Sequence, residues 1–237
     1  MDDKIRINKY LSQKGICSRR EADKLIEERR VKINGEIASN GTKINEYDEV
    51  MLDGNLINVN VDKIVLAYNK PIGITCTHKD VHADKTVFDD IAYPSILNYA
   101  GRLDKDSHGL LLLTNDGDLI NRLMRSKNEH EKEYVVNVNK PITKDFIDKI
   151  QGNVYLKELD LTTKKCKAWK IEKNVFGIIL KQGLNRQIRR MCSEFGYNVT
   201  DLKRVRVKNI LLGQVKEGKY RVIEGKELET LYEGLDE

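Results

Sequence analysis

The sequence predicts an α+β fold in which a small N-terminal unit of helices and hairpins precedes a larger unit built on a β-sheet. Strand-like segments follow one another, mostly without a crossover helix, which favours a mixed, largely antiparallel sheet with packed helices. Residues 110–113 are four consecutive leucines bounded by turn residues, as in a buried strand. A change of pattern near residues 58–64 divides the chain into domains 1–60 and 64–237.

Two short helices are expected near the N-terminus. Apolar side chains at helical spacing within residues 7–11 predict the first helix. Ser18 and Glu21 form a capping box, in which the Ser18 hydroxyl accepts from a backbone amide and Glu21 reaches back, so a second helix should begin there. Arg19 and Arg20 would then lie in its first turn, where the helix dipole disfavours cations. That local cost suggests that the two arginines serve an anionic partner such as phosphate.

Two hairpins should complete the N-terminal unit. Residues 31–33 alternate as a strand and are followed by Asn-Gly, and residues 50–52 are followed by Asp-Gly; both dipeptides are strong hairpin signals. The charges of this unit are uneven. Residues 1–35 contain ten Lys or Arg against six acids, whereas residues 36–60 contain one Lys against five acids.

The larger unit alternates predicted strands and helices. Strands are expected at residues 65–68, 110–113, 132–138, 163–171 and 175–180, with two more before the C-terminal helix. Helices are expected at residues 86–91, 119–124 and 143–150, after Gly183, and at the C-terminus around residues 228–232. Pro71 cannot join a strand ladder and Gly73 permits a turn, so the first of these strands should end before them.

Composition narrows the classes of function. The chain has a net charge of +5, and residues 181–208 hold eight basic side chains against two acids, so a polyanion should be contacted at two places. The four cysteines are far apart without C-x-x-C spacing, which argues against zinc and disulfides. No apolar run reaches membrane length and the N-terminus lacks a signal-peptide core, so a cytoplasmic protein is expected, with no membrane contact.

The candidate site centres on the loop before the leucine strand. Arg102 and Asp104 lie on this loop, and a buried strand would hold them rigidly. No Gly-rich nucleotide motif, P-loop or His-Cys cluster occurs, so no cofactor and no metal are expected. Asp104, Tyr134 and Arg189 remain as a carboxylate, an aromatic ring and an arginine that can act on a nucleobase. Taken singly, Tyr134 would fit a core strand and Arg189 a solvated helix face.

The N-terminal unit resembles an S4 RNA-binding domain. The resemblance is carried by residues 6–11, 15–23 and 31–35, which match in order. It implies two short helices and a strand that present arginines to structured RNA. The RNA-binding residues that it implies are Arg6, Lys9, Arg19 and Arg20.

The larger unit resembles the RsuA-type pseudouridine synthases. The matching motifs are residues 69–73, 101–117, 132–134 and 183–192, in the family's order. With the S4 match in front, the resemblance covers essentially the whole chain. Residues 128–134 and 163–166 are most similar to the branch of ribosomal large-subunit pseudouridine synthase F. Ser107 stands where much of the family has Thr, which keeps the hydroxyl.

The resemblance implies that the glycosidic bond of a uridine in RNA breaks and that the uracil turns and is rejoined through carbon. Asp104 maps onto the catalytic aspartate, and a carboxylate can serve as nucleophile or base; whether it attacks the sugar, the base or a sugar proton stays open. Tyr134 maps onto the tyrosine that lies against the uracil. Arg189 maps onto the arginine that pairs with the aspartate and would keep it ionised. Arg102 would fill the gap left by the flipped base. Further RNA contacts are expected at Arg186 and Arg190.

The expected partner is ribosomal RNA, most directly 23S rRNA, bound by a monomer without a small-molecule cofactor. The same chemistry on 16S rRNA or on transfer RNA stays open, because target choice depends on RNA shape and on loops outside the motifs. A different class, a non-catalytic RNA-binding protein of the ribosome, would use the same basic stretches without the aspartate loop.

Overall fold

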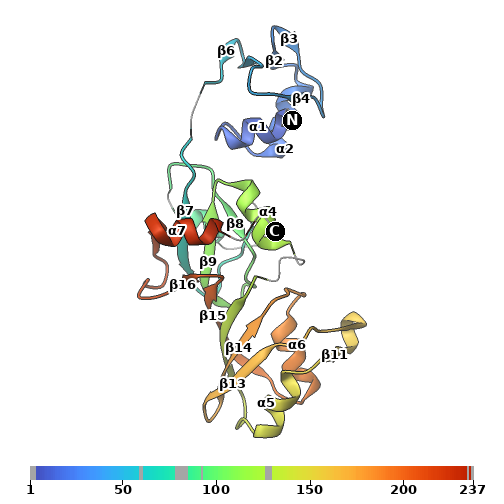
Figure 1. Cartoon of the computed structure of the whole chain (residues 1–237), viewed down its shortest axis with the longest axis vertical. Coiled ribbons are helices and arrows are strands. Elements are labelled where there is room, and N and C mark those ends of the chain that lie inside the picture. The colour runs from blue at the N-terminus through green and yellow to red at the C-terminus, as the bar shows by residue number, and fades with distance from the viewer. Residues whose placement is uncertain are drawn as a thin grey trace. The chain divides into compact units, whose positions relative to one another are not determined.

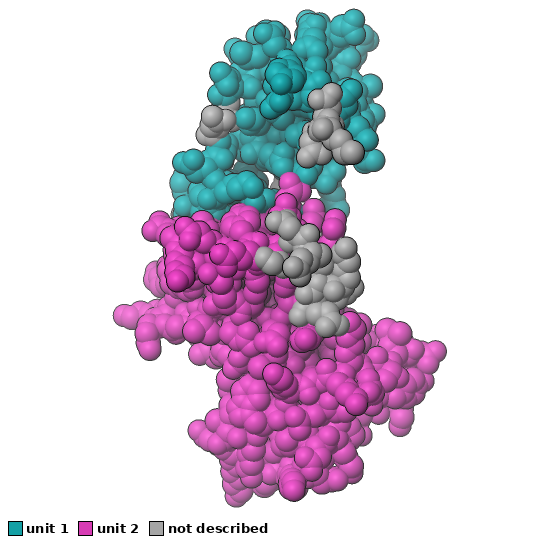
Figure 2. All heavy atoms as spheres, viewed as in Figure 1, with its two compact units in different colours: residues 1–64, 93–98, 115–117 teal, residues 65–92, 99–114, 118–237 magenta. Residues whose placement is uncertain are grey.

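The computed structural model describes residues 4–58, 61–77, 85–91, 93–125, 130–233 and 235. Two units are distinguished, coloured teal and magenta in Figure 2. Unit 1 comprises residues 1–64, 93–98 and 115–117, and unit 2 comprises residues 65–92, 99–114 and 118–237. The domain limits expected from the sequence stay a prediction, and the boundary at residue 60 falls outside the described residues. Residues 128 and 129 of the motif at 128–134 also lie outside them.

Unit 1 begins with two helices on two small sheets (Figure 1). Its helices are α1 (Ile7–Gln13) and α2 (Arg19–Glu27), and its strands are β1 (Ile5–Arg6), β2 (Val31–Ile33), β3 (Glu36–Ile37), β4 (Lys43–Ile44), β5 (Val50–Leu52) and β6 (Asn55–Leu56). The strands pair as β3-β2-β5-β6 and as β1-β4. The predicted capping box is confirmed: Glu21 N donates to Ser18 Oγ at 3.3 Å, and Ser18 N donates to Glu21 Oε2 at 2.9 Å. Both predicted hairpins, β2-β3 and β5-β6, are present.

Unit 2 is built on a mixed sheet. Its strands are β7 (Val65–Lys70), β8 (Asn98–Ala100), β9 (His108–Thr114), β10 (Lys132–Val138), β13 (Lys167–Glu172), β14 (Val175–Leu180), β15 (Val199–Val207), β16 (Ile210–Leu211) and β17 (Tyr220–Val222). Among the described residues the order is β13-β14-β10-β15-β9-β7-β17, with β16 beside β15 and β8 beside β9. In this order β15 and β9 are parallel and the other neighbours antiparallel, which confirms the predicted mixed, largely antiparallel sheet.

Helices pack on both faces of this sheet. They are α3 (Val87–Asp90), α4 (Gly117–Met124), α5 (Lys144–Ile150), α6 (Gln187–Glu194) and α7 (Gly225–Tyr232); a hairpin of β11 (Tyr155–Leu156) and β12 (Leu161–Thr162) encloses the 3-10 turn Lys157–Leu159. Helices α5 and α6 bury Phe146 and Met191 against Phe176 and Ile178 of β14. Helices α4 and α7 share a second core with β7 and β9. No described helix has the length and apolar character needed to cross a membrane.

One expected strand is shorter than predicted. The strand predicted at residues 163–171 begins only at Lys167, as β13, and residues 163–166 lie outside the strands, after β12, which ends at Thr162. Thr163 is buried between β12 and β13, and its Oγ1 accepts from Val154 N at 3.0 Å while its own amide donates to Val154 O at 2.8 Å. The threonine therefore bonds the chain before β11 and leaves the ladder, a local alternative that sequence alternation does not reveal.

Candidate active site

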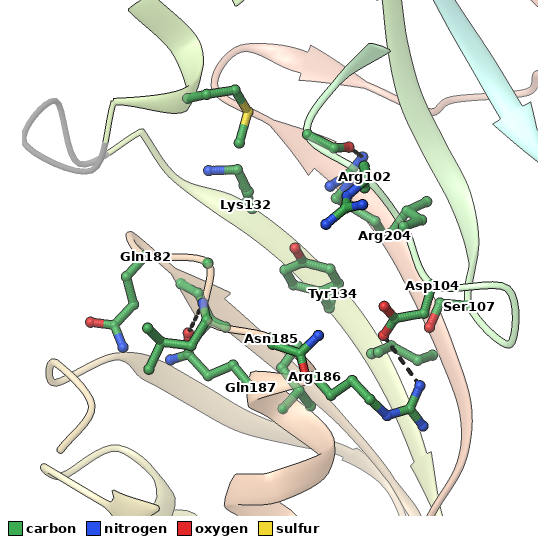
Figure 3. Close-up of a pocket in the computed structure, with 18 residues that line it drawn as sticks. Arg102, Asp104, Ser107, Lys132, Tyr134, Gln182, Asn185, Arg186, Gln187 and Arg204 are labelled. Atoms are coloured by element: carbon green, nitrogen blue, oxygen red, sulfur yellow. Dashed lines mark hydrogen bonds and ion pairs between the residues drawn. The ribbon is translucent and has the colours of Figure 1, made fainter. Parts of the chain in front are cut away.

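A pocket of about 350 Å³ opens in unit 2 and is lined by the loop of residues 101–107, by β10 and β15, and by the turn before α6 (Figure 3). The loop precedes β9, and the turn with α6 precedes β15. Because β9 and β15 are parallel, the segments that precede them arrive at the same end of the sheet. Residues about eighty positions apart are thereby brought together, such as Arg186 and Asp106.

Gly109 lets β9 approach β15. Its φ is +97°, and a Cβ placed there would overlap the backbone of Arg204. Glycine has neither the side chain nor the restriction on φ, so this position of the strand accepts it without strain.

A buried lysine, Lys70, hydrogen-bonds the loop that carries Asp104. Lys70, at the end of β7, is fully buried, and its Nζ donates to Ser107 O at 2.8 Å and to Pro71 O at 2.9 Å. Gly73 N donates to Lys105 O at 2.8 Å. Burial lowers the pKa of Lys70. Lys70 therefore has a structural role, and its bonds to two backbone carbonyls hold the loop in place against the sheet.

The carboxylate of Asp104 faces the pocket, with 38% of its side chain exposed. Its Oδ2 lies 3.5 Å from Nη1 of Arg186. Arg186 has a left-handed backbone, with φ of 49°, and directly precedes α6. This conformation is uncommon for a residue other than glycine and often marks a functional constraint.

A second carboxylate shares the same arginine. Asp106 binds Arg186 through two bonds of 3.1 and 2.8 Å, from Nη1 and Nη2. The bound guanidinium of Arg186 holds the pKa of Asp106 below its usual value, against the effect of burial. Both of these bonds are shorter than the 3.5 Å contact between Asp104 and Arg186. Asp106 therefore holds the Arg186 guanidinium in position, and Asp104 makes only a weaker contact with one of its nitrogens.

Arg189 does not pair with Asp104 in the structure, so the pairing implied by the family resemblance is corrected. Its Nη2 donates to Asp106 O at 2.9 Å and to Ser107 Oγ at 3.3 Å, and its Nη1 donates to Val199 O at 3.2 Å. Arg189 lies inside the first turn of α6, so its side chain reaches the base of the loop and β15, whereas Arg186 lies before the helix and reaches over the pocket. The Ser107 hydroxyl is the acceptor that a Thr would also offer.

Tyr134 lies on β10 and lines the pocket, as expected for a ring that contacts a base. The pairing of β10 with β15 shifts register between Glu133 and Tyr134. Such a bulge re-aims side chains and is common next to active sites. Tyr134 is here paired with Arg204 of β15, and both residues line the pocket.

Two pocket residues were missed by sequence analysis, Lys132 and Arg204. Lys132 is 8% exposed and Arg204 1% exposed. Arg204 Nε donates to Leu110 O at 2.7 Å and Nη2 donates to Gly101 O at 2.9 Å. Alternation offered a signal, because Lys132 shares the strand face of Tyr134 and Arg204 that of the buried Leu202.

The other predicted RNA contacts differ in position. Arg102 is exposed and lines the pocket. Arg190 is turned away from the pocket: it pairs with Glu158, and its Nε donates to Asn185 O at 3.1 Å. Both arginines pair with carboxylates, Arg190 with Glu158 and Arg186 with Asp106, so RNA contact at either stays an untested prediction.

In unit 1 the predicted RNA-binding residues gather at the starts of the two helices. Arg6 precedes α1, and Arg19 and Arg20 open α2. All three are exposed, and Lys9 is half-buried on α1. Arg19 Nη2 donates to Asn8 Oδ1 at 3.4 Å, which links the two helices. The grouping suits a phosphate backbone, and contact with RNA at these positions stays a prediction.

Among the described residues no group of His, Cys, Asp and Glu is placed to hold a metal ion. The pocket instead offers a carboxylate, a phenol ring and four cations, Arg102, Lys132, Arg186 and Arg204. A carboxylate beside an aromatic ring can act on a flat, uncharged base, and cations can bind the phosphates on either side of it.

Comparison with known proteins gives consistent matches along the chain. A family model described as RNA pseudouridylate synthase matches residues 64–194, and an S4 domain model matches residues 5–50. The dual-specificity RNA pseudouridine synthase RluF of Escherichia coli K12 is 46% identical over 99% of this chain and 81% of its own. The ribosomal large subunit pseudouridine synthase B of Pseudomonas aeruginosa is 32% identical over 96% of this chain and 62% of its own. A crystal structure of a pseudouridylate synthase, 29% identical, superposes with a TM-score of 0.71 over 96% of this chain and 99% of that one.

Proposed function

The chain belongs to the RNA pseudouridine synthase family, and on this premise we propose that it modifies a uridine of 23S ribosomal RNA in the pocket around Asp104. Enzymes of this family isomerise uridine in RNA to pseudouridine. The bond from ribose C1′ to N1 of uracil is replaced by a bond from C1′ to C5, and the hydrogen lost from C5 is balanced by one gained at N1. Atoms and electrons balance within the nucleotide, so neither an oxidant nor a group donor is consumed.

The observation that supports the site is the meeting of Asp104, Tyr134 and Arg102 around one pocket. A uridine inside a duplex cannot reach a carboxylate, so the nucleotide has to be flipped out, which costs a few kcal/mol. In our proposal Arg102 fills the gap, Tyr134 contacts the face of the uracil and Asp104 acts as nucleophile or base.

Arg186 and Arg189 then support Asp104 in different ways. Arg186 lies against Asp104 and supplies the positive charge next to the reacting carboxylate. Arg189 acts as a positioning residue: it bonds the backbone of Asp106 and the hydroxyl of Ser107, and so holds the loop on which Asp104 lies.

The choice of 23S rRNA rests on the relatives. The Pseudomonas relative is named a large-subunit ribosomal synthase, and the Escherichia relative a dual-specificity RNA pseudouridine synthase. The second name implies more than one target for that protein, so 16S rRNA and transfer RNA belong in any assay of this chain.

An RNA substrate also suggests roles for the two domains, an oligomeric state and a location in the cell. We propose that residues 1–60 form an RNA-binding arm with Arg6, Lys9, Arg19 and Arg20, and that residues 64–237 form the catalytic domain. We propose that the chain acts as a monomer, since the proposed roles of Asp104, Tyr134 and Arg102 require no residue from a second copy. Ribosomal RNA is made and matured in the bacterial cytoplasm, and the enzyme should work there.

The test is to map pseudouridine in cells that lack the gene. Carbodiimide labelling of 23S, 16S and transfer RNA should reveal a modification that is lost from 23S rRNA and is restored by the intact gene but not by Asp104→Asn. If the modification disappears from 16S or transfer RNA alone, the catalytic site stands and the substrate is wrong. Unchanged pseudouridine in every RNA class would reject the proposal and favour a non-catalytic RNA-binding protein.

A further inference from the structure

The pocket contains a pair of buried cations that the proposed chemistry does not use. Lys132 and Arg204 lie on the adjacent strands β10 and β15, and both line the pocket. In Figure 3, Lys132, Arg102 and Arg204 lie on one side of Tyr134, and Arg186 lies on the other side. The pocket therefore has a reacting end at Asp104 and a separate cationic end.

In the described part of the chain, no nearby carboxylate neutralises the positive charge at the cationic end of the pocket. The acidic residue that lines the pocket is Asp104, and it contacts Arg186. Next to Lys132 in sequence, Glu131 and Glu133 both bind Arg206, at 3.0 and 2.8 Å.

The positive charges of Lys132 and Arg204 also repel each other. Arg204 donates to two backbone carbonyls, which satisfy its hydrogen bonds without neutralising its charge. Burial and, secondly, the charge of Arg204 lower the pKa of Lys132 to about 8. Two like charges held together in a buried site are unfavourable unless an anion joins them.

We propose that Lys132, with Arg204, forms a binding subsite for a backbone phosphate next to the flipped uridine. This inference rests on the proposed function, since it takes RNA as the ligand. Uracil carries no charge, so a convergence of cations fits a phosphate better than the base. Residues two apart on one strand face are about 7 Å apart. A base that contacts Tyr134 would then place its adjoining backbone, not its own edge, beside Lys132.

The first experiment measures RNA affinity against salt for Lys132→Met, which fills the same volume without charge. With total ribosomal RNA as the probe, affinity at moderate salt should fall by roughly tenfold or more, and the salt slope should become shallower by about one. Thermal stability should stay equal or rise, since an unpaired buried cation is removed. Lys132→Arg keeps the charge and should keep the slope.

Lys167→Met is the matched control. Lys167 is an exposed lysine of β13, and it points to the opposite sheet face, because its neighbour Ala168 pairs with Ile178, which in turn pairs with Tyr134. This control should change affinity less than twofold. An equal loss in both variants would show a general charge effect and overturn the subsite. Unchanged affinity and slope in Lys132→Met would also overturn it.

The second experiment locates the phosphate. A stem-loop RNA with the mapped uridine is made with one flanking phosphate at a time replaced by a neutral methylphosphonate, and each RNA is tested with both proteins. One replacement should weaken wild-type binding as much as Lys132→Met does, and the two changes together should add nothing further. Full additivity at every position would overturn the subsite. If the wild type makes no pseudouridine in any RNA class, the proposed function fails separately, while the affinity comparison with ribosomal RNA still decides the subsite.

Discussion

Asp104 is the residue on which the proposed reaction depends, yet it is a minor part of the RNA-binding surface. Affinity for RNA comes mainly from cations on phosphates and from stacking. Asp104→Asn should therefore abolish pseudouridine formation and leave RNA affinity within a few-fold. The measurement is turnover and binding on the same RNA with purified, folded protein. Full activity of Asp104→Asn would remove the aspartate from the mechanism.

Arg186 and Arg189 can be separated by their effects on stability. Arg186 is 41% exposed and, among the described residues, bonds only carboxylates, whereas Arg189 is 15% exposed and bonds the backbone of Asp106 and Val199 in addition to the side chains of Asp106 and Ser107. Arg186→Ala should lower turnover by more than tenfold with little change in melting temperature. Arg189→Ala should lower turnover and also cost roughly 1–3 kcal/mol of stability, because the carbonyls of Asp106 and Val199 lose their donor. Activity and thermal unfolding are measured on both variants. Turnover near wild type in Arg186→Ala would return the pairing role to Arg189.

Lys132 predicts a specific pH dependence. Its pKa in the folded protein is about 8, below the ordinary 10.5, so between these values the unfolded chain binds more protons. Stability should therefore rise with pH across this window, by on the order of 3 kcal/mol in total, and this rise should be missing in Lys132→Met. RNA affinity should change in the opposite sense and weaken above about pH 8, because a phosphate binds the protonated amine. Urea unfolding and RNA binding at pH 7 and pH 10 test both signs.

The positions and partners of some site residues could be predicted from the sequence, and those of others could not. Asp104 and Tyr134 were proposed from long motifs, on a loop and a strand that alternation also predicts, and both line the pocket. The pairing of Arg186 rather than Arg189 could not be predicted, because it depends on a left-handed backbone at Arg186 and on competition from Asp106. The burial of Arg204 depends on carbonyls of Leu110 and Gly101, which only the folded sheet brings near it.

At the scale of elements, two glycines test how tightly strands pack. A Cβ at Gly109 would overlap the backbone of Arg204, and its φ of +97° is strained for other residues. A Cβ at Gly177 would overlap the ring of Trp169, which is 38% exposed and can rotate away. Gly109→Ala should cost roughly 3 kcal/mol or more and lose activity, whereas Gly177→Ala should cost about 1 kcal/mol. Denaturant unfolding of both variants gives the comparison; equal costs would contradict this account.

Elements were predictable where local chemistry decides them. The capping box at Ser18, the hairpin dipeptides and the extent of β10 and β14 all follow from neighbours in sequence. The strand expected at residues 163–171 is present only from Lys167, because Thr163 bonds Val154, a partner nine positions away that no periodicity encodes.

At the scale of the whole molecule, the two units should contribute different kinds of affinity. An arm that neutralises a few phosphates supplies salt-dependent, sequence-tolerant binding. Deleting residues 1–60 should leave a folded protein that binds RNA weakly, with a shallower salt slope, and whose turnover at saturating RNA falls less than its efficiency at low RNA. Coinciding slopes and affinities for the full and truncated chains would show that the unit is no RNA-binding arm.

The cut itself can be placed from contacts. Asn115 Oδ1 accepts from Ile64 N at 2.9 Å, and its Nδ2 donates to Asp62 O at 2.8 Å. Lys63 pairs with Asp116 at 2.9 Å. A truncated chain that begins at residue 61 keeps these bonds, so a loss of affinity can be assigned to the missing arm and not to damage at the turn after β9.

The parallel pairing of β9 with β15 also bears on the order of folding. Its partners, His108 with Lys203 and Gly109 with Arg204, are almost a hundred residues apart, whereas β13 and β14 are joined by a tight turn. Long-range pairings form slowly because the entropy of closing a long loop comes before any gain from contact. Asp104 and Arg186 meet only once this pair exists. A nascent chain would thus hold most of its sheet while still inert, and catalysis would be the final property to appear.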